Sequence, residues 1–175
     1  MFSLKKWWKE RKLKGKFYDF VDRMEWERAI QLADENEEIL KDDDILFNYA
    51  WCCVEIGEFE KAEVILENLK DEFSYSPVYW ILLAKVYLER EEEEKFFEAV
   101  ESAKRIDPTH PVLRFLLGKY YARKGMLERA ASEFEYFTSE YTGYKDALVL
   151  AYLERGIFLK DVDKLRSEAK DEKSG

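Results

Sequence analysis

Hydrophobic and small residues recur every three or four positions through residues 112–137, a spacing typical of amphipathic helices. The pattern is interrupted at Lys124-Gly125, so this stretch predicts two helices joined by a tight turn. The side chains that carry the pattern are Leu117, Gly118 and Tyr121 on the first helix, at the spacing L-G-x-x-Y, and Ala130 and Phe134 on the second.

A short motif at the predicted turn recurs along the chain. Its copies begin at Trp26, Phe59, Glu93, Leu127 and Phe158, which are 33, 34, 34 and 31 residues apart. Such regular spacing indicates internal repeats and not a chance similarity. The predicted repeats are approximately residues 10–42, 43–76, 77–110, 111–141 and 142–175.

This pattern resembles the tetratricopeptide repeat, whose unit is a helix–turn–helix of about 34 residues. The resemblance covers nearly the whole chain and is most specific in the three central repeats. It implies an all-α, right-handed superhelical solenoid of about four repeats plus terminal helices. Small residues are expected where the two helices of a repeat cross. They are Ala50, Ala84 and Gly118 on the first helices, and Ala29, Ala62 and Ala130 on the second.

Several positions depart from the repeat pattern, among them Phe17, which stands at a small-residue position and makes the first repeat the weakest match. Glu91 stands where a turn glycine is usual, and Phe96 stands where a small residue is usual. We therefore expect the helices of the third repeat to splay or its turn to differ. Asp161 takes the small-residue position of the last repeat, where no close crossing is expected and the polar end fits a capping helix.

Charge separates a short N-terminal segment from the remaining chain. Residues 1–16 carry seven Lys and Arg against one Glu, a net charge of +6, which leaves −15 for residues 17–175. We therefore predict a basic, aromatic segment at 1–16 and a repeat domain at 17–175. The acidic repeat domain argues against nucleic acid as a partner and favours basic or apolar partners.

Composition bears on the cellular setting. No apolar run approaches the roughly 20 residues needed to span a membrane, and the N-terminus lacks the features of a secretory signal. The only cysteines, Cys52 and Cys53, are adjacent and do not form a disulfide framework of the secreted kind. We expect a cytoplasmic protein. Abundant Lys and Glu with few amides suggest a thermophilic source.

No motif in the sequence predicts catalysis. His110 is the only histidine, and a general base or metal ligand needs partners that the sequence does not place beside it. Cys52 and Cys53 are expected to be inert core thiols, because adjacent residues of a helix point to different faces. The run Glu91–Glu94 is expected to be a solvated turn, and no cofactor or metal is predicted. We expect that the protein is not an enzyme.

The resemblance places a candidate binding surface on the first helix of each repeat. In tetratricopeptide proteins these helices line a concave groove, and large apolar residues occupy groove positions that the repeat itself does not require. Such a patch marks an interface, unless a helix of the same chain or a second copy covers it. The side chains that clamp a chaperone's terminal carboxylate in this family are absent. The predicted partner-binding residues are Phe47, Trp51, Ile81, Lys85, Phe115, Lys119 and Arg123.

The N-terminal segment offers a second candidate surface. Basic, Trp-containing helices can lie on anionic membrane surfaces. The same segment could instead pack on the first repeat as an opening helix, or fold over the groove, and Gly15 weakens a long helix. The residues predicted for membrane contact are Leu4, Lys5, Lys6, Trp7, Trp8 and Lys9.

These patterns predict a non-catalytic scaffold that binds a peptide or helix of a partner protein in the concave groove. Two alternatives stay open at this stage. One is a peripheral membrane adaptor anchored by the N-terminal segment, and the other is a self-assembling structural module. The sequence does not identify the partner.

Overall fold

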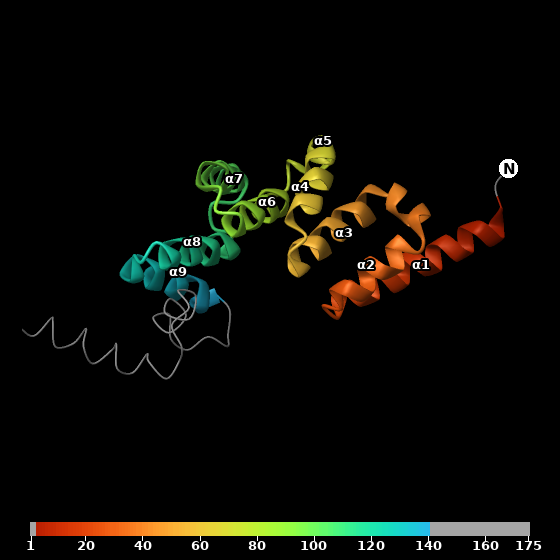
Figure 1. Ribbon diagram of the computed structural model, residues 1–175, viewed down its shortest axis with the longest axis horizontal. Helices are drawn as coiled ribbons and strands as arrows, with labels where there is room; N and C mark the ends of the chain where they lie inside the picture. The colour runs from red at the N-terminus through yellow and green to blue at the C-terminus, as the bar shows by residue number, and fades with distance from the viewer. Residues whose placement is uncertain (1–2, 141–175) are drawn as a thin grey trace, which may run out of the picture. The chain divides into compact units, whose positions relative to one another are not determined.

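The computed structural model describes residues 3–140, with side chains up to residue 135 (Figure 1). The regular secondary structure in this range is helical, which confirms the predicted all-α class. The chain divides into two compact units, Met1–Ile106 and Asp107–Gly175. The last predicted repeat, 142–175, and Asp161 within it lie outside the described residues.

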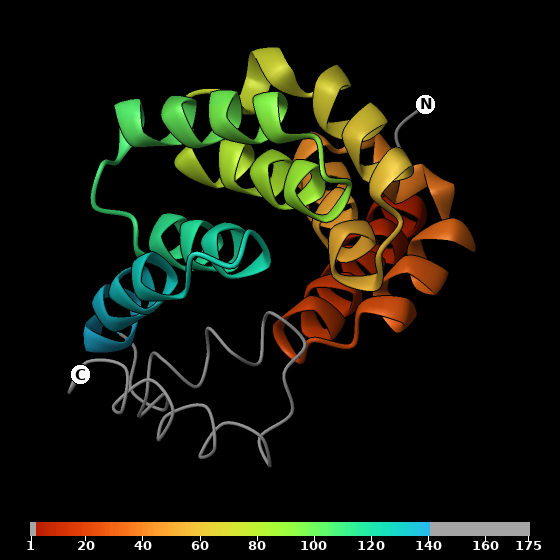
Figure 2. The ribbon, with the colours of Figure 1, turned by 60° about the vertical axis from the view of Figure 1, so that its left-hand side comes forward.

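The first unit is a series of helical hairpins in which α1 packs on α2, α3 on α4 and α6 on α7. Figure 2 shows α6 and α7 side by side as one such hairpin. Two short elements that the repeat pattern does not predict, η1 and α5, lie between consecutive hairpins. The bounds are α1 Leu4–Asp22, α2 Trp26–Asp34, η1 Glu37–Lys41, α3 Asp43–Ile56, α4 Phe59–Asn68, α5 Lys70–Phe73, α6 Pro77–Glu89 and α7 Glu93–Ile106.

The described part of the second unit is one hairpin of α8 (Pro111–Arg123) and α9 (Leu127–Glu140). Pro111 lies in the first turn of α8, where a missing backbone N–H costs no helical hydrogen bond. Phe134 of α9 is 1% exposed and packs with Ala122 and Ala130 in the core of this hairpin. The hairpin predicted from the L-G-x-x-Y pattern is thus present.

All four described hairpins end their first helix with the same backbone turn. A residue with positive φ stands at each turn: Met24 (57°), Gly57 (85°), Glu91 (58°) and Gly125 (77°). In each case the amide of the following residue donates to the carbonyl five residues earlier, at 2.8–2.9 Å. This is the Schellman arrangement of a helix C-terminus. The expectation of a different turn in the third repeat is wrong, because Glu91 adopts the left-handed conformation despite its Cβ.

Small residues lie at the helix crossings, as the repeat pattern predicts. Ala29, Ala50, Ala62 and Ala84 are fully buried, which lets the paired backbones approach closely. Phe96, which replaces the small residue in the third repeat, is also buried, at 1% exposure. The hairpin of α6 and α7 therefore accommodates the larger ring inside its core.

The first helix, α1, runs without a break through Gly15 and across the predicted boundary after residue 16. Its second half is anchored in the core by Phe17 and Phe20, at 0% and 8% exposure. Asp42 caps the following α3 by accepting hydrogen bonds from the amides of Asp44 and Ile45.

Candidate protein-binding site

In the first unit, α3 and α6 are joined by a polar and aromatic network. The indole N–H of Trp51 donates to Glu55 Oε1 at 3.0 Å, and Lys85 Nζ donates to the same oxygen at 2.7 Å. Trp51 also stacks on Trp26 of α2, with ring centroids 6.4 Å apart and planes 23° from parallel. The three side chains Trp51, Glu55 and Lys85, which we call the α3–α6 strip, are partly exposed.

The charged members of this strip keep access to solvent. The side chains of Lys85 and Glu55 are 29% and 24% exposed, and the ion pair that they form spans two helices of consecutive hairpins. Both side chains are held in one position by this pair and by the hydrogen bond from Trp51. The strip therefore presents an indole face, a carboxylate and an ammonium group in a fixed arrangement.

Two predicted contact residues of the first unit lie mainly in the core. Phe47 is 8% exposed, and its ring stacks on Phe73 of α5 at 4.5 Å between centroids and 8° between planes. Ile81 is 7% exposed. Phe73 of the same chain thus covers the Phe47 ring that the sequence assigned to the groove. Phe47 and Ile81 stand four positions before Trp51 and Lys85 on α3 and α6, and they offer little exposed area of their own.

The predicted contact residues of the second unit lie on α8. Phe115 is partly buried against Phe134, with ring centroids 5.5 Å apart, and Lys119 Nζ lies 5.8 Å from the Phe115 ring centroid. Arg123 is exposed on the last turn of α8. This helix thus places one aromatic and two basic side chains at the positions that the repeat pattern assigns to a binding face.

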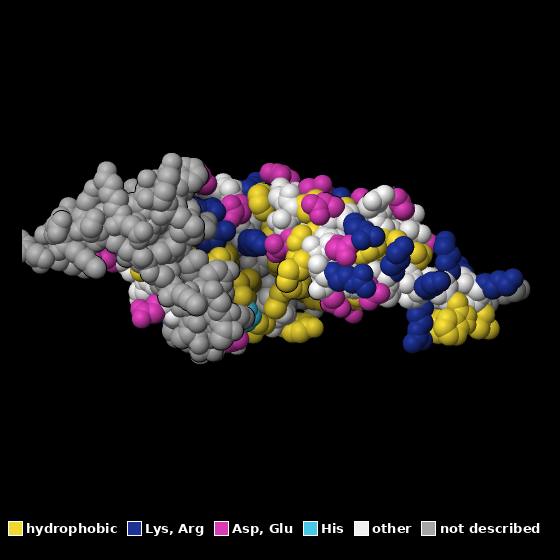
Figure 3. All heavy atoms as spheres, turned by 90° about the horizontal axis from the view of Figure 1, so that it is seen from below, with side chains coloured by type: hydrophobic (Ala, Val, Ile, Leu, Met, Phe, Trp, Pro, Cys, Tyr) yellow, Lys and Arg dark blue, Asp and Glu magenta, His cyan; other side chains and the backbone are white. Residues whose placement is uncertain are grey.

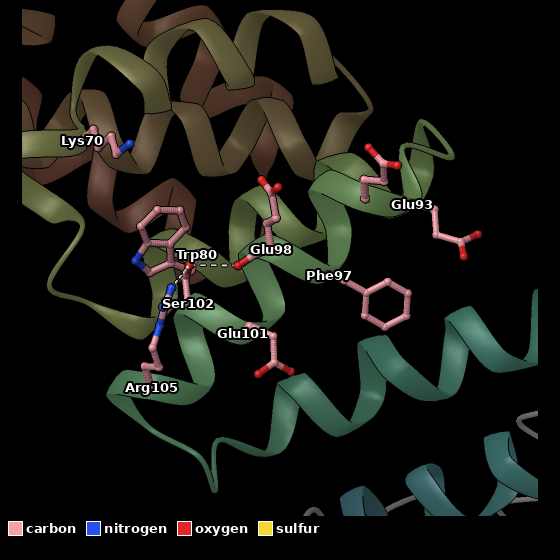
Figure 4. Close-up of a pocket in the computed structure, with 9 residues that line it drawn as sticks. Lys70, Trp80, Glu93, Phe97, Glu98, Glu101, Ser102 and Arg105 are labelled. Atoms are coloured by element: carbon pink, nitrogen blue, oxygen red, sulfur yellow. Dashed lines mark hydrogen bonds between the residues drawn. The ribbon is translucent and has the colours of Figure 1, made fainter.

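A depression not predicted from the sequence lies along α6 and α7 (Figure 4). It is open to solvent and is lined by several glutamates with Trp80 and Arg105. Several of its polar groups already have partners within the chain. Trp80 donates to the Ser74 carbonyl at 2.8 Å, and Ser102 accepts from Arg105 at 3.0 Å. Because the depression is open and lined largely by charged side chains, it lacks the enclosed apolar walls of a small-molecule site.

The cysteines lie in a setting that suppresses thiol chemistry. Cys52 and Cys53 are both fully buried in α3, and burial raises the pKa of each thiol to about 12. A thiol with such a pKa holds almost no thiolate at neutral pH and is a poor nucleophile or metal ligand. Within residues 3–140, no group of three or more His, Cys, Asp or Glu side chains is placed to hold a metal ion.

The first half of α1 projects its side chains into solvent. Leu4, Trp7 and Trp8 are 65%, 38% and 59% exposed, and Lys5, Lys6 and Lys9 are exposed beside them. Figure 3 shows hydrophobic and basic side chains together at this end of the chain. None of the helices within the described part has the length and apolar character that crossing a membrane requires.

Comparison with solved structures identifies the architecture. A thermophilic TPR protein of Thermus thermophilus, TTC0263, matches 84% of this chain and 83% of its own, with a TM-score of 0.67 and 19% identity. The chain has the tetratricopeptide-repeat fold. MamA matches 89% of this chain and 95% of its own with a TM-score of 0.56 and 18% identity. YrrB, described as a TPR protein with an unusual peptide-binding site, matches 86% of this chain and 79% of its own, with a TM-score of 0.52 and 20% identity.

A relative by sequence supports the same repeat. The TPR repeat-containing protein YpiA of Bacillus subtilis is 31% identical over 119 residues, or 63% of this chain. The matched region is 27% of YpiA, so the chain spans about a quarter of this relative's length. No protein-family model matches the chain. The resemblance drawn from the turn motif and the L-G-x-x-Y pattern is thus confirmed at the level of the tetratricopeptide repeat.

The aromatic side chains that stack on Trp51 and Phe47 in this tetratricopeptide-repeat chain were not predicted. Trp26 stacks on Trp51 from α2, and Phe73 covers Phe47 from α5. Trp26 begins a copy of the turn motif, and large residues also begin the copies at Phe59 and Leu127. The motif therefore indicated a packed side chain at Trp26. Phe73 belongs to a single helical turn that follows the second hairpin inside the predicted repeat 43–76, and the helix–turn–helix pattern does not encode this turn.

Proposed function

We propose that the chain is a non-catalytic scaffold that binds a peptide or helix of a partner protein on the face of α3 and α6. The observation that carries the proposal is the partly exposed indole of Trp51, fixed by Glu55 and Trp26 beside the Lys85 ammonium group. Tryptophan dominates the binding energy of many protein interfaces, and a side chain already held in place loses little entropy on binding.

The residues of this face would act in different ways. Trp51 would receive an apolar side chain of the ligand, and the buried Phe47 and Ile81 would fix α3 and α6 from the core. Lys85 would orient an acidic group of the ligand, in competition with Glu55, which already accepts its hydrogen bond. The ligand would therefore combine an apolar anchor with a carboxylate.

On α8, the corresponding face would contribute Phe115, Lys119 and Arg123 to the same function. These residues also pair an aromatic ring with basic groups, which favours acidic, partly apolar peptides. The description of YrrB as having a peptide-binding site supports peptide recognition as a capacity of this architecture.

A peptide-display selection against the full chain tests the proposal. Peptides that the chain retains should combine acidic and apolar residues, and Trp51→Ala should weaken their binding about 30-fold, equivalent to ~2 kcal/mol. Val64→Ala is the matched control, because Val64 is a 59% exposed apolar residue on α4 and does not belong to the α3–α6 strip. Binding is measured by isothermal titration, and far-ultraviolet circular dichroism checks that each variant is folded.

Two results would contradict the proposal. Peptides that bind Trp51→Ala as tightly as the original chain would place the binding surface elsewhere. If no peptide is retained and light scattering shows an oligomer that Trp51→Ala dissociates, a second copy of the chain occupies this face. That outcome would replace the scaffold proposal with self-assembly.

A further inference from the structure

The helix α1 carries apolar residues on two opposite sides. At 3.6 residues per turn, Leu13, Phe17 and Phe20 lie on one side, and Leu4 and Trp8 lie on the other. The first side is the one that packs into the fold, since Phe17 and Phe20 are 0% and 8% exposed. The other side faces away from the fold, and nothing in the described part of the chain buries it.

The exposed side is a compact aromatic and aliphatic patch. Leu4 is 65% exposed, Trp8 is 59% exposed, and Trp7 meets Trp8 edge to face with ring centroids 5.1 Å apart. The Arg11 guanidinium lies 5.2 Å from the Trp7 ring centroid and ends the patch after two helical turns. We call Leu4, Trp7 and Trp8 the α1 patch.

Basic side chains surround the α1 patch, and three acidic side chains of α1 and the adjoining segment form ion pairs with two of the lysines. Glu38 pairs with Lys9 at 3.5 Å, while Glu10 and Asp42 both pair with Lys14, at 3.1 and 2.7 Å. Within residues 3–140, Lys5 and Lys12 form no ion pair and stay exposed on the flank of the patch. The acidic character of the repeat domain is therefore offset around this end of α1.

The patch is preformed. The Ser3 side chain caps α1 by accepting a hydrogen bond from the Lys6 amide at 3.5 Å, and the second half of the same helix is fixed in the core. A surface-binding segment that is already helical does not lose backbone entropy on binding. The fold thus holds two indoles and several ammonium groups out from one rigid helix.

We propose that the α1 patch is a docking surface for an anionic lipid bilayer. Indole rings favour the headgroup region because they are apolar with one N–H donor, and flanking lysines can extend their stems along the apolar surface towards lipid phosphates. Positive charge that lacks an internal partner complements an anionic surface directly.

A groove on a protein partner fits the α1 patch less well. Helices that bind in grooves present apolar anchors over at least i, i+3 or i+4, and i+7. Here the position seven residues after Leu4 is Arg11, so the apolar stripe stops after two turns. A bilayer surface needs no longer stripe and no complementary pocket, and short Trp-containing basic helices suit it.

Vesicle flotation with the full chain tests this assignment. The chain should float with phosphatidylcholine vesicles that contain phosphatidylglycerol, and not with vesicles of phosphatidylcholine alone. Raising the salt concentration should weaken the binding, because the exposed lysines are screened. Replacing all three residues of the α1 patch by serine should lower binding at least about tenfold. Replacing Lys5, Lys6 and Lys12 by glutamine should lower it about fivefold for each charge removed.

Matched controls separate the patch from general surface properties. The apolar control is the pair Val64→Ser and Tyr75→Ser, at residues that are 59% and 75% exposed in the same unit. The charge control replaces Lys70, Lys104 and Arg105 by glutamine, at positions outside α1 and η1. Both controls should float like the original chain. Circular dichroism and thermal midpoints should be unchanged in every variant, because the substituted side chains lie outside the core.

Three results would overturn the proposal. The first is a full chain that does not float with anionic vesicles. The second is flotation that survives loss of both the α1 patch and the three lysines. The third is a concentration-dependent dimer, measured by sedimentation velocity, that the serine variant dissociates while vesicle binding is absent, because the patch would then meet a second copy of the chain.

Discussion

Replacing Gly118 by alanine tests how closely α8 and α9 approach each other. A Cβ at this position would lie 2.7 Å from Phe134 Cε1, 2.8 Å from Cδ1 and 2.9 Å from Cζ. Real Cβ contacts essentially never fall below 3.0 Å, so either the ring or the helix has to move. Phe134 is 1% exposed and packs among Ala122 and Ala130, which leaves the ring no open space to enter.

Two free-energy terms oppose each other in this substitution. Alanine is favoured over glycine inside a helix by about 1 kcal/mol. Overpacking of a well-packed core costs about 1–3 kcal/mol. Because the added methyl meets three ring atoms of a buried side chain, we expect the packing cost to exceed the helix gain. The predicted net change for Gly118→Ala is a loss of about 1 kcal/mol of unfolding free energy.

Urea denaturation followed by circular dichroism measures this loss, and two further variants isolate its cause. Gly15→Ala is the matched control, because α1 is continuous through Gly15 and nothing lies within 4 Å of an added Cβ there. It should gain stability of up to about 1 kcal/mol. In a Phe134→Leu background the clash is removed, so Gly118→Ala should become neutral or stabilising. If Gly118→Ala stabilises the original chain as much as Gly15→Ala does, the close approach is refuted.

Two further predictions concern the turn conformation and the pH dependence of stability. Glu91→Gly should raise the unfolding free energy by about 1 kcal/mol, because Glu91 has a φ of 58°. Gly57→Ala should lower the unfolding free energy by a similar amount, although an added Cβ meets no steric clash there. A urea midpoint that does not rise for Glu91→Gly would contradict backbone strain at Glu91. The hydrogen bond from Lys14 holds the pKa of Asp42 below its ordinary value, so the pair stabilises the fold at neutral pH and the contribution is lost as the pH falls through the lowered pKa. Asp42→Asn keeps an N-cap but removes the charge, so its thermal midpoint should lie below that of the original chain at pH 7, and the difference should shrink below about pH 4. A difference that does not change with pH would exclude the Asp42 charge as its cause.

The repeat architecture was predictable because its constraints are local and steric. A small residue is required where two helix backbones cross, and the alanines at 29, 50, 62 and 84 satisfy this requirement with full burial. The turn glycines were less reliable guides. Met24 and Glu91 adopt the same left-handed conformation as Gly57, because the Schellman hydrogen bonds and the packed hairpin outweigh the local preference against a Cβ.

The helix face that carries the candidate site was predictable, but which residues of that face are covered by other side chains was not. The repeat register placed Trp51 and Lys85 on α3 and α6, where they form one connected strip. The register could not show that Phe73 stacks on Phe47, since α5 is not one of the two helices that define the repeat. Helical periodicity likewise shows that α1 has two apolar sides, whereas it cannot show which of them packs into the core and which stays exposed.

The Glu55–Lys85 ion pair links the architecture to the proposed function. A carboxylate of a ligand can reach Lys85 only by displacing or sharing with Glu55, whose side chain also orients Trp51. Partly exposed ion pairs contribute little to stability, in the range of about 0–1 kcal/mol, so this exchange costs the fold little. The pair would therefore hold the indole ready when no ligand is present and allow an acidic peptide to take its place. A face built in this way would discriminate between ligands by charge, because a basic or neutral peptide gains nothing from Lys85 that Glu55 does not already supply.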